Sequence, residues 1–465
     1  MQIEDKNISQ ARGLTLLQTL LIIPGGVLPF FFPLAITLYW FTIVIICFLA
    51  LTRDKPQWIW YCIAASPGME VWARMSRAPY LPDETGKYFL LYAIMLLVIH
   101  HVLRRSEKPL YRVGMAVIIL FIPSLIAGLS GFDFQDWVFN ILGPLELCAL
   151  LLLAARERWP IENFCRTLQC ALLPIVAMVI FITVKAPSFE DLQFGLIANS
   201  SASGGFGSNQ ISTILGAGVV LTMLLLLLHR PLFAVKWLNY LVLFYLLFRG
   251  LLTFSRGGVI VAIIGIIVAL YPYIFESLRS FLRYSALFVF LILAGALIFI
   301  KLNDMTGNML LLRYEGETYG TLSGTRQKSV NLFLSGRADI IQSDLEIFAD
   351  HPIWGAGPGG ARHLRESYGY MASAAHTEFS RLLSEHGIAG LCIIVLLSVF
   401  PFVWIRRQTI KPWKGIIGAL FTLAILTSFH AAMRTNVTVV FYALAAIPVL
   451  YYLNNEEENE DTLPG

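Results

Sequence analysis

Long apolar runs alternate with short charged connections along nearly the whole chain. A helix needs roughly 20 apolar residues to cross a bilayer, whereas a barrel strand needs about half as many in an alternating pattern. Unbroken runs such as residues 214–228 therefore predict helices. The pattern predicts an all-α polytopic membrane protein with about 14 transmembrane helices, in a range of 12–14. The predicted spans are residues 14–31, 34–51, 57–73, 87–103, 113–130, 135–155, 166–184, 209–228, 235–254, 257–275, 284–300, 387–405, 414–431 and 436–453.

Basic residues indicate which connections stay in the cytoplasm. Lys and Arg concentrate in alternate connections, for example at 104–112 and 406–414, and the positive-inside rule makes these cytoplasmic. Both termini then lie in the cytoplasm, and two long connections, 185–208 and 302–386, face outward. The chain divides into N-terminal transmembrane helices (1–301), a large outward-facing loop (302–386), C-terminal transmembrane helices (387–453) and an acidic cytoplasmic tail (454–465).

Apolar residues at helical spacing predict two amphipathic helices in the large loop. The first starts at Gly336 and stops before Pro352, and one face carries Ile341, Leu345 and Phe348. The second has Thr377 as N-cap and stops at Gly387, and its apolar face carries Phe379, Leu382, Leu383 and His386. These helices are expected to lie on the outer surface and to roof a cavity.

Composition narrows the class of protein. Of the 465 residues, 57% are hydrophobic and only 14% are charged, with a mean hydropathy of +0.70. These values exclude a water-soluble globule, a disordered chain and a nucleic-acid binder. The six cysteines lie in or beside apolar runs, which favours buried side chains over disulfides or a zinc site. The outward loops show no metal-ligand spacing, and the GAGPGG string at 355–360 is predicted to be a turn because no βαβ strand precedes it.

Three outward-lying arginines are candidates for binding an anion. Arg256 follows a helix end and precedes two glycines, which would let the chain turn tightly and bring the guanidinium close to a ligand. Arg249 lies one or two turns deeper, where charges usually face a cavity. Arg337 begins a predicted helix, whose dipole attracts anions. Two converging guanidinium groups suit a pyrophosphate; the alternatives are lipid-headgroup contact for Arg256 and a surface ion pair for Arg337.

His376 is the candidate proton acceptor. Small residues precede it and a predicted helix follows it. An imidazole titrates near neutral pH and can accept a proton from an attacking hydroxyl. The alternative is a structural histidine that is hydrogen-bonded at the membrane surface.

Taken together, these motifs resemble the O-antigen ligase and polymerase superfamily of bacterial envelope enzymes. The resemblance rests on LTFSRGG (252–258), on SGR (335–337) followed by a helix and DHPIWGAGPGG (350–360), and on His376, eleven residues before Gly387. The FGSNQ stretch (206–210) is similar to the family's Gly-x-Asn element, so the resemblance covers roughly residues 200–400.

The resemblance implies a GT-C-like glycosyltransferase of the bacterial inner membrane that needs no metal or cofactor. Such an enzyme transfers a glycan from undecaprenyl pyrophosphate to an acceptor sugar hydroxyl on the periplasmic side, with inversion at the sugar. By this likeness, Arg256 and Arg337 hold the pyrophosphate and His376 activates the acceptor hydroxyl. Thr377 and Glu378 replace the Asn, Ser or Gln that usually follows the histidine, so the acceptor contacts would differ. The predicted substrate-binding residues are Arg256, Arg337, Arg249, Asn209 and Glu378.

Several reactions fit the resemblance. A polysaccharide or O-antigen polymerase is favoured, because the span count and the lack of an arginine before FGSNQ fit a ligase less well. A ligase that attaches polymer to lipid A-core and a protein O-oligosaccharyltransferase are alternatives. A flippase for lipid-linked glycans is the alternative of another class, but flippases tend to show matching halves. The implied partners are the lipid-linked donor, a glycan or lipid-linked acceptor, membrane lipids, and a chain-length regulator or other envelope assembly proteins.

Overall fold

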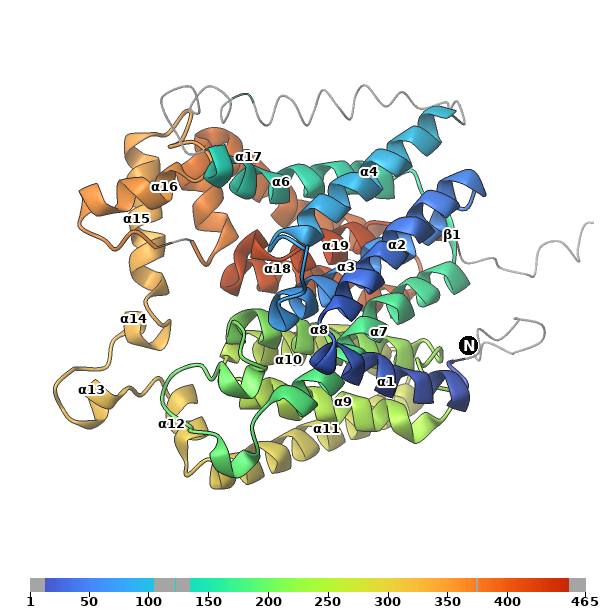
Figure 1. The fold of residues 1–465 in the computed structure, drawn as a ribbon, viewed down its shortest axis with the longest axis horizontal. Helices are drawn as coiled ribbons and strands as arrows, with labels where there is room; N and C mark the ends of the chain where they lie inside the picture. The colour runs from blue at the N-terminus through green and yellow to red at the C-terminus, as the bar shows by residue number, and fades with distance from the viewer. Residues whose placement is uncertain (1–12, 104–121, 123–133, 374, 451–465) are drawn as a thin grey trace, which may run out of the picture.

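The computed structural model describes residues 13–103, 122, 134–373 and 375–450. Long helices run side by side in a bundle, and the helices of the large loop gather at one end (Figure 1). Nine helices in the described residues are long and apolar enough to cross a membrane, which confirms the all-α multi-pass class. The helices at the predicted spans are α1 (Leu16–Phe31), α2 (Leu34–Thr52), α3 (Gln57–Ser76), α4 (Thr85–Leu103), α6 (Phe134–Ala154), α7 (Ile161–Lys185), α8 (Ser208–Leu227), α9 (Lys236–Leu252), α10 (Arg256–Ile274), α11 (Leu278–Met305), α17 (Glu378–Arg407), α18 (Lys411–His430) and α19 (Val437–Ala445).

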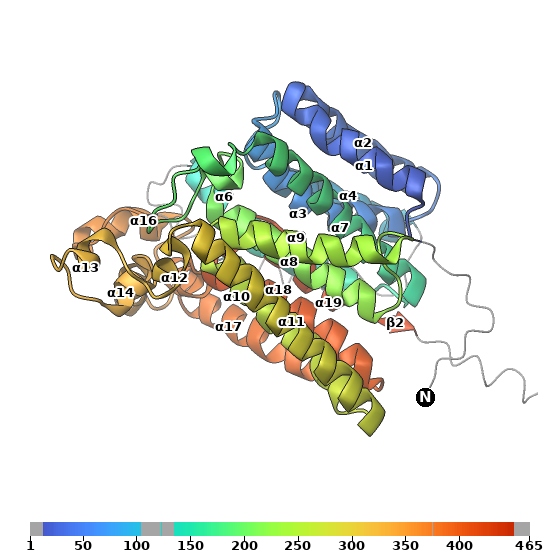
Figure 2. The ribbon, with the colours of Figure 1, turned by 90° about the horizontal axis from the view of Figure 1, so that it is seen from below.

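Each predicted span within the described residues overlaps one of these helices, although the last is helical only in its first half. Apart from residue 122, the predicted span 113–130 lies outside the described residues, as does the tail 454–465. α3 continues unbroken through Pro67, and the adjacent Gly68 lets α3 pack against Pro174 and Ile175 of α7. Figure 2 shows α1 and α2 along one edge of the bundle, with α11 and α17 along the opposite edge.

The central and peripheral helices differ in how much of their surface the protein covers. In its membrane-length window, 89% of α8 is buried, compared with 6% of α11. α8 packs against α7, α9 and α10, and α18 packs against α10 and α19. The exposed apolar side chains of the peripheral helices, such as Phe290, Leu297 and Phe402, are suited to contact with lipid.

The last predicted span, 436–453, is only half helical. α19 has nine residues, which rise about 14 Å. The chain then extends to β2 (Val449–Leu450), which pairs in parallel with β1 (Trp159–Pro160) before α7. Non-helical backbone at membrane depth is tolerated where protein buries it. Residues 437–447 are buried, and Trp404 Nε1 donates to the Ala445 carbonyl (3.1 Å).

The large loop folds into five helices. Its helix α15 coincides with the first predicted amphipathic helix. The prediction that its apolar face, with Leu345, is the buried one is wrong. Ser343, Asp344 and Ile347 are buried, whereas Leu345 is 48% exposed. Asp344 forms a buried ion pair with Arg365 of η4, and this pair turns the polar face inward. The loop elements are α12 (Met309–Tyr314), α13 (Tyr319–Leu322), α14 (Val330–Phe333), α15 (Arg337–Asp350), α16 (Gly360–Leu364) and the 3-10 helix η4 (Arg365–Tyr368).

α17 extends beyond the predicted stop at Gly387. This glycine has φ 57° and ψ −134°, so the helix bends there and continues as a membrane span. At the bend, the carbonyls of Ser384 and Glu385 accept the backbone N–H groups of Ala356 (2.8 Å) and Gly357 (3.0 Å). Both donors belong to the GAGPGG turn, which is confirmed as a turn. The glycine therefore produces a kink that docks this turn onto α17.

Candidate functional site

Most of the predicted site residues lie at one end of the bundle. Helices α8, α10, α17 and α19 begin there, and α18 ends there. Hydrogen bonds join these helix ends through three pairs, namely Ser255–Asn209, Thr213–His430 and Glu378–Met433. Residues separated by more than 200 positions therefore meet at this end.

The segment before Arg256 is fixed by the start of α8. Phe254 has a left-handed backbone (φ 56°) and makes the turn between α9 and α10. The Ser255 hydroxyl donates to Asn209 Oδ1 (2.8 Å), and the Ser212 hydroxyl donates to the Ser255 carbonyl (3.0 Å). In this structure, Asn209 therefore positions the residue that precedes Arg256.

Gly257 and Gly258 do not form the tight turn that the sequence predicts, because both lie in the first turn of α10. A Cβ on Gly257 would lie 2.1 Å from the ring of His430, and a Cβ on Gly258 would lie 1.9 Å from the Ser212 carbonyl oxygen. The two glycines therefore allow α10 to approach α18 and α8 closely. This packing holds Arg256 at the shared helix ends.

Arg256 and Arg313 contact the same short segment of the large loop. The Arg256 guanidinium donates to the Phe333 carbonyl and to the Ser335 hydroxyl (3.4 Å), and it lies 4.4 Å from the centroid of the Phe333 ring. Arg313 donates to the same hydroxyl (3.2 Å) and to the Leu196 carbonyl (3.2 Å). Nη1 of Arg256 is buried and has no hydrogen-bond partner in the part of the chain that the structure describes. Nη1 is therefore a donor that the described residues leave unpaired.

Arg337 begins α15, two residues after Ser335. It forms a group of three arginines with Arg256 and Arg313. Burial and then the charge of Arg256 lower the pKa of Arg337. Burial, followed by Arg256 and Arg337, lowers the pKa of Arg313. Arg256 and Arg313 share the Ser335 hydroxyl and Arg337 follows Ser335 by two positions, so the like charges of these side chains disfavour one another. Within the described residues, no carboxylate forms an ion pair with Arg256, Arg313 or Arg337, which we call the arginine group.

His376 lies half-buried before α17, beside this group. Burial, followed by the positive charges of Arg434, Arg337 and Arg365, lowers the pKa of His376 to about 4. The imidazole is therefore neutral at neutral pH and can accept a proton. Arg434 also donates to the carbonyl of Ala375 (2.9 Å), directly before His376, and so holds this part of the backbone. The charge of Arg256 acts on Arg337 and the charge of Arg337 acts on His376, so Arg337 lies within electrostatic range of both residues.

Arg249 lies apart from this group. Its Nη2 donates to the carbonyls of Ala202 (2.9 Å) and Ile182 (3.5 Å), and the residue is buried. These contacts fix the Gly- and Ser-rich connection between α7 and α8 against α9. None of the described hydrogen bonds of Arg249 involves Arg256 or His376.

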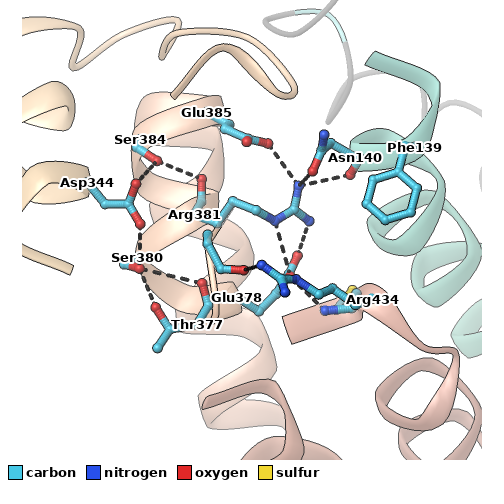
Figure 3. Close-up of polar contacts among 12 residues, drawn as sticks. Phe139, Asn140, Asp344, Thr377, Glu378, Ser380, Arg381, Ser384, Glu385 and Arg434 are labelled. Atoms are coloured by element: carbon cyan, nitrogen blue, oxygen red, sulfur yellow. Dashed lines mark hydrogen bonds and ion pairs between the residues drawn. The ribbon is translucent and has the colours of Figure 1, made fainter. Parts of the chain in front are cut away.

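Glu378 belongs to a buried ion-pair network (Figure 3). It pairs with Arg381, and its Oε2 accepts the backbone N–H of Met433 (3.0 Å). Arg381 also pairs with Glu385 (2.8 Å) and donates to the Asn140 carbonyl (3.1 Å). Glu378 is only 2% exposed, so its carboxylate mainly joins α17 to the connection between α18 and α19.

Three residues of this site were missed by the sequence analysis. Arg313 and Tyr314 end a short apolar run, and Arg434 stands alone in a short connection, so no motif marks them. The hydroxyl of Tyr314 is buried without a hydrogen-bond partner among the described residues. Burial raises the pKa of Tyr314, whereas neighbouring Arg256 and Arg313 oppose that rise. The hydroxyl is therefore a neutral donor beside two guanidinium groups.

The arrangement is suited to a polyanion beside a reacting hydroxyl. Three guanidinium groups and a phenol can donate hydrogen bonds to phosphate oxygens, and guanidinium groups stay charged at any working pH. A neutral imidazole next to them can take a proton. In the described ranges, no three His, Cys, Asp or Glu side chains are grouped in a way that could hold a metal ion.

Part of the chain is similar to a known protein family. Residues 241–395 match the family model described as O-antigen ligase, and a comparison with curated proteins finds no match. The matched segment begins in α9, ends in α17 and includes the arginine group and His376. This match confirms the predicted resemblance to the O-antigen ligase and polymerase superfamily over residues 241–395.

Proposed function

We propose that this membrane protein transfers a glycan from undecaprenyl pyrophosphate to an acceptor sugar hydroxyl at the periplasmic face of the bacterial inner membrane. The observation that carries the proposal is the arginine group, which has no carboxylate partner among the described residues and adjoins a neutral imidazole. The outward orientation of this end is supported by the distribution of Lys and Arg along the sequence. The family match supports a reaction of the glycosyl-transfer type.

In the proposed reaction, the acceptor oxygen bonds to the anomeric carbon of the donor glycan. The bond from that carbon to the pyrophosphate oxygen breaks, and its electron pair leaves with the pyrophosphate. The acceptor proton passes to His376. Direct displacement inverts the anomeric carbon, and the arginine group stabilises the negative charge that develops on the leaving group.

The charges around His376 support proton transfer to the imidazole after the donor has bound. The cations that keep the pKa of His376 at about 4 include Arg337, which belongs to the arginine group. A bound pyrophosphate would offset that positive charge and strengthen the imidazole as a base. The base would therefore become effective once the donor is bound.

Among acceptors, we propose a growing polysaccharide chain, as in a polymerase. The absence of an arginine before FGSNQ supports this choice. The description of the matching family supports the second candidate, a ligase that transfers finished polymer to lipid A-core. Both reactions use the same donor chemistry and differ in the acceptor.

The deciding experiment is His376→Ala in the native host, with surface glycans separated by size. Loss of long chains is expected. Accumulation of single repeat units identifies a polymerase, whereas finished polymer retained on the lipid carrier identifies a ligase. His351→Ala, which removes an exposed histidine of the same loop, is the control and should leave chain length unchanged. Normal chains in His376→Ala contradict the proposed role of His376, and loss of export of the lipid-linked unit favours a flippase.

A further inference from the structure

The connection between α18 and α19 has a backbone that depends on its surroundings. Its 3-10 helix η5 (Ala432–Arg434) begins at Ala432, whose backbone is left-handed (φ 51°). A residue other than glycine in this conformation is strained, and the strain persists only where neighbouring groups fix the backbone. Arg434, whose side chain reaches the segment before His376, ends η5. The place of Arg434 therefore depends on what holds this connection.

Two side chains of α3 fix the backbone of this connection. Arg74 Nη1 donates to the Arg434 carbonyl (3.2 Å), and Glu70 Oε2 accepts the backbone N–H of Asn436 (2.9 Å). Asn436 in turn donates through Nδ2 to the Ser66 hydroxyl of α3 (2.7 Å). Glu70 and Arg74 lie one turn apart and form an ion pair (2.6 Å) whose carboxylate is fully buried. Therefore α3 fixes the backbone on both sides of residue 435.

Protein groups use most of the hydrogen-bonding capacity of Arg74. Besides Glu70 and the Arg434 carbonyl, its guanidinium donates to Gln210 Oε1 of α8 (3.2 Å) and to the Asp83 carbonyl (2.6 Å). These four hydrogen bonds use four of the five N–H groups of the side chain. Arg74 is therefore suited to positioning protein groups rather than to binding a ligand. Gln210 is the last residue of the FGSNQ stretch, so this motif helps to place Arg74.

The side chain of Arg434 links this connection to the imidazole of His376. Its Nη2 donates to the Ala375 carbonyl (2.9 Å). Among the charges that lower the pKa of His376, that of Arg434 has the largest effect. The other groups whose charges interact with the imidazole are Arg337 of α15, Arg365 of η4 and His430 of α18. The cation with the strongest effect on the proposed base is therefore the one whose backbone α3 fixes.

Resting on the proposed function, we propose that Glu70 and Arg74 are positioning residues, which hold Arg434 beside His376. They act through Arg434, so their effect on the reaction is a change in the basicity of the imidazole. If this ion pair were lost, Arg434 would move away from the imidazole, which would then take up a proton at higher pH. An ion pair of a transmembrane helix would thereby set the working pH range of a base in the large loop.

The test uses the purified full chain in nanodiscs, without substrate, and the variant Arg74→Gln. Diethyl pyrocarbonate acylates a neutral imidazole but not a protonated one, and mass spectrometry gives the labelling of His376 from about pH 3 to 8. In the wild-type chain, half of this labelling should be lost only near pH 4. In Arg74→Gln the midpoint should rise by about one pH unit, because Arg434 is no longer held beside the imidazole. Arg77→Gln, which removes the exposed arginine at the end of α3, is the matched control and should leave the midpoint unchanged.

A double variant separates positioning from an independent effect of Arg74. Arg434→Gln alone should move the midpoint at least as far as Arg74→Gln, and the double variant should move it no further, because both changes act through one cation. A midpoint that Arg74→Gln leaves unmoved, or shifts that add in the double variant, overturns the proposal. If Arg74→Gln does not fold, Arg74→Lys replaces it. This variant keeps a positive charge beside Glu70 but lacks the guanidinium fork, so its midpoint should also rise, and an unmoved midpoint again overturns the proposal.

The labelling requires no substrate, so it separates this proposal from the proposed function. If the midpoint shifts as expected but the wild-type chain transfers no glycan, the transferase proposal fails and the positioning role stands. If the wild-type chain transfers glycan but Arg74→Gln does not shift the midpoint, the positioning role fails and the transferase proposal stands.

Discussion

Two sets of arginines lie at the same end of the bundle and differ in what surrounds them. Arg365 and Arg381 are buried and paired with three carboxylates, Asp344, Glu378 and Glu385. The arginine group contacts backbone carbonyls, hydroxyls and an aromatic ring, with no carboxylate partner in the described part of the chain. The first set joins helices, whereas the second retains positive charge that a ligand can use.

This difference shows how to separate structural from ligand-binding arginines. A buried charge is costly unless a partner offsets it, and removal of that partner is strongly destabilising. A guanidinium that contacts only neutral groups has no neighbouring negative charge to offset its own. It can therefore bind phosphate oxygens through two parallel hydrogen bonds. The presence or absence of a neighbouring acid therefore indicates whether an arginine is structural or binds a ligand.

The largest expected effect is on folding, from Glu378→Ala. This change leaves Arg381 with one carboxylate fewer and removes the acceptor of the Met433 N–H. The free energy of unfolding should fall by about 3–5 kcal/mol. Thermal unfolding in detergent measures it, and Glu366→Ala, at an exposed position of the loop, is the control. A variant with normal stability and lost acceptor binding would instead support the substrate-binding role that the sequence analysis predicts for Glu378.

The next effect is on activity, from Arg337→Ala and Arg256→Ala. Each variant should lower the transfer rate about 10²- to 10³-fold, because it removes a charge that stabilises the leaving group. Unfolding should be unchanged, in contrast to Glu378→Ala. Arg337→Lys should restore little activity, since a lysine lacks the planar fork. Initial rates with purified protein measure this, and full activity of the Lys variant would mean that positive charge alone suffices.

The smallest effect is a shift in pH dependence. His376 must be neutral to accept a proton, and its pKa is about 4, so kcat/KM should fall only as the pH drops through about 4. Arg434→Gln removes a cation near the imidazole, so the pKa of His376 should rise toward its ordinary value near 6.5 and the activity loss should begin at higher pH. Rates from pH 4 to 8 test this. A wild-type midpoint near 6.5 that Arg434→Gln leaves unmoved would contradict the assignment.

The sequence predicted the transmembrane helices well for a physical reason. The length and polarity of each span are local properties, and a helix in lipid must satisfy its own backbone. The exception is α19, whose half-helical span depends on hydrogen bonds from other helices. Periodicity also failed for α15, where the pairing of Asp344 with Arg365 outweighs the preference of Leu345 for burial.

The site could be predicted only in part. The SRGG and SGR motifs identified Arg256 and Arg337, and His376 was found from its flanking residues and its family resemblance. The roles of Gly257 and Gly258 depend on which helices α10 meets, and no local pattern reveals this. Arg313, Tyr314 and Arg434 reach the site only because the loop and the α18–α19 connection fold over it.

The short helix α19 and the strand that follows it bear on how the chain enters the membrane. A translocon releases segments that can meet lipid unaided, but the carbonyls of Ala445 and Pro448 accept hydrogen bonds from Trp404 and Trp159. The segment 437–450 should therefore insert only where β1 and α17 are already in place. A chain lacking residues 1–160 should leave a cysteine introduced at Ala446 open to an impermeant thiol reagent, whereas the intact chain should protect it. Membrane insertion of the chain would then end with a segment that packs between elements formed earlier in the same chain.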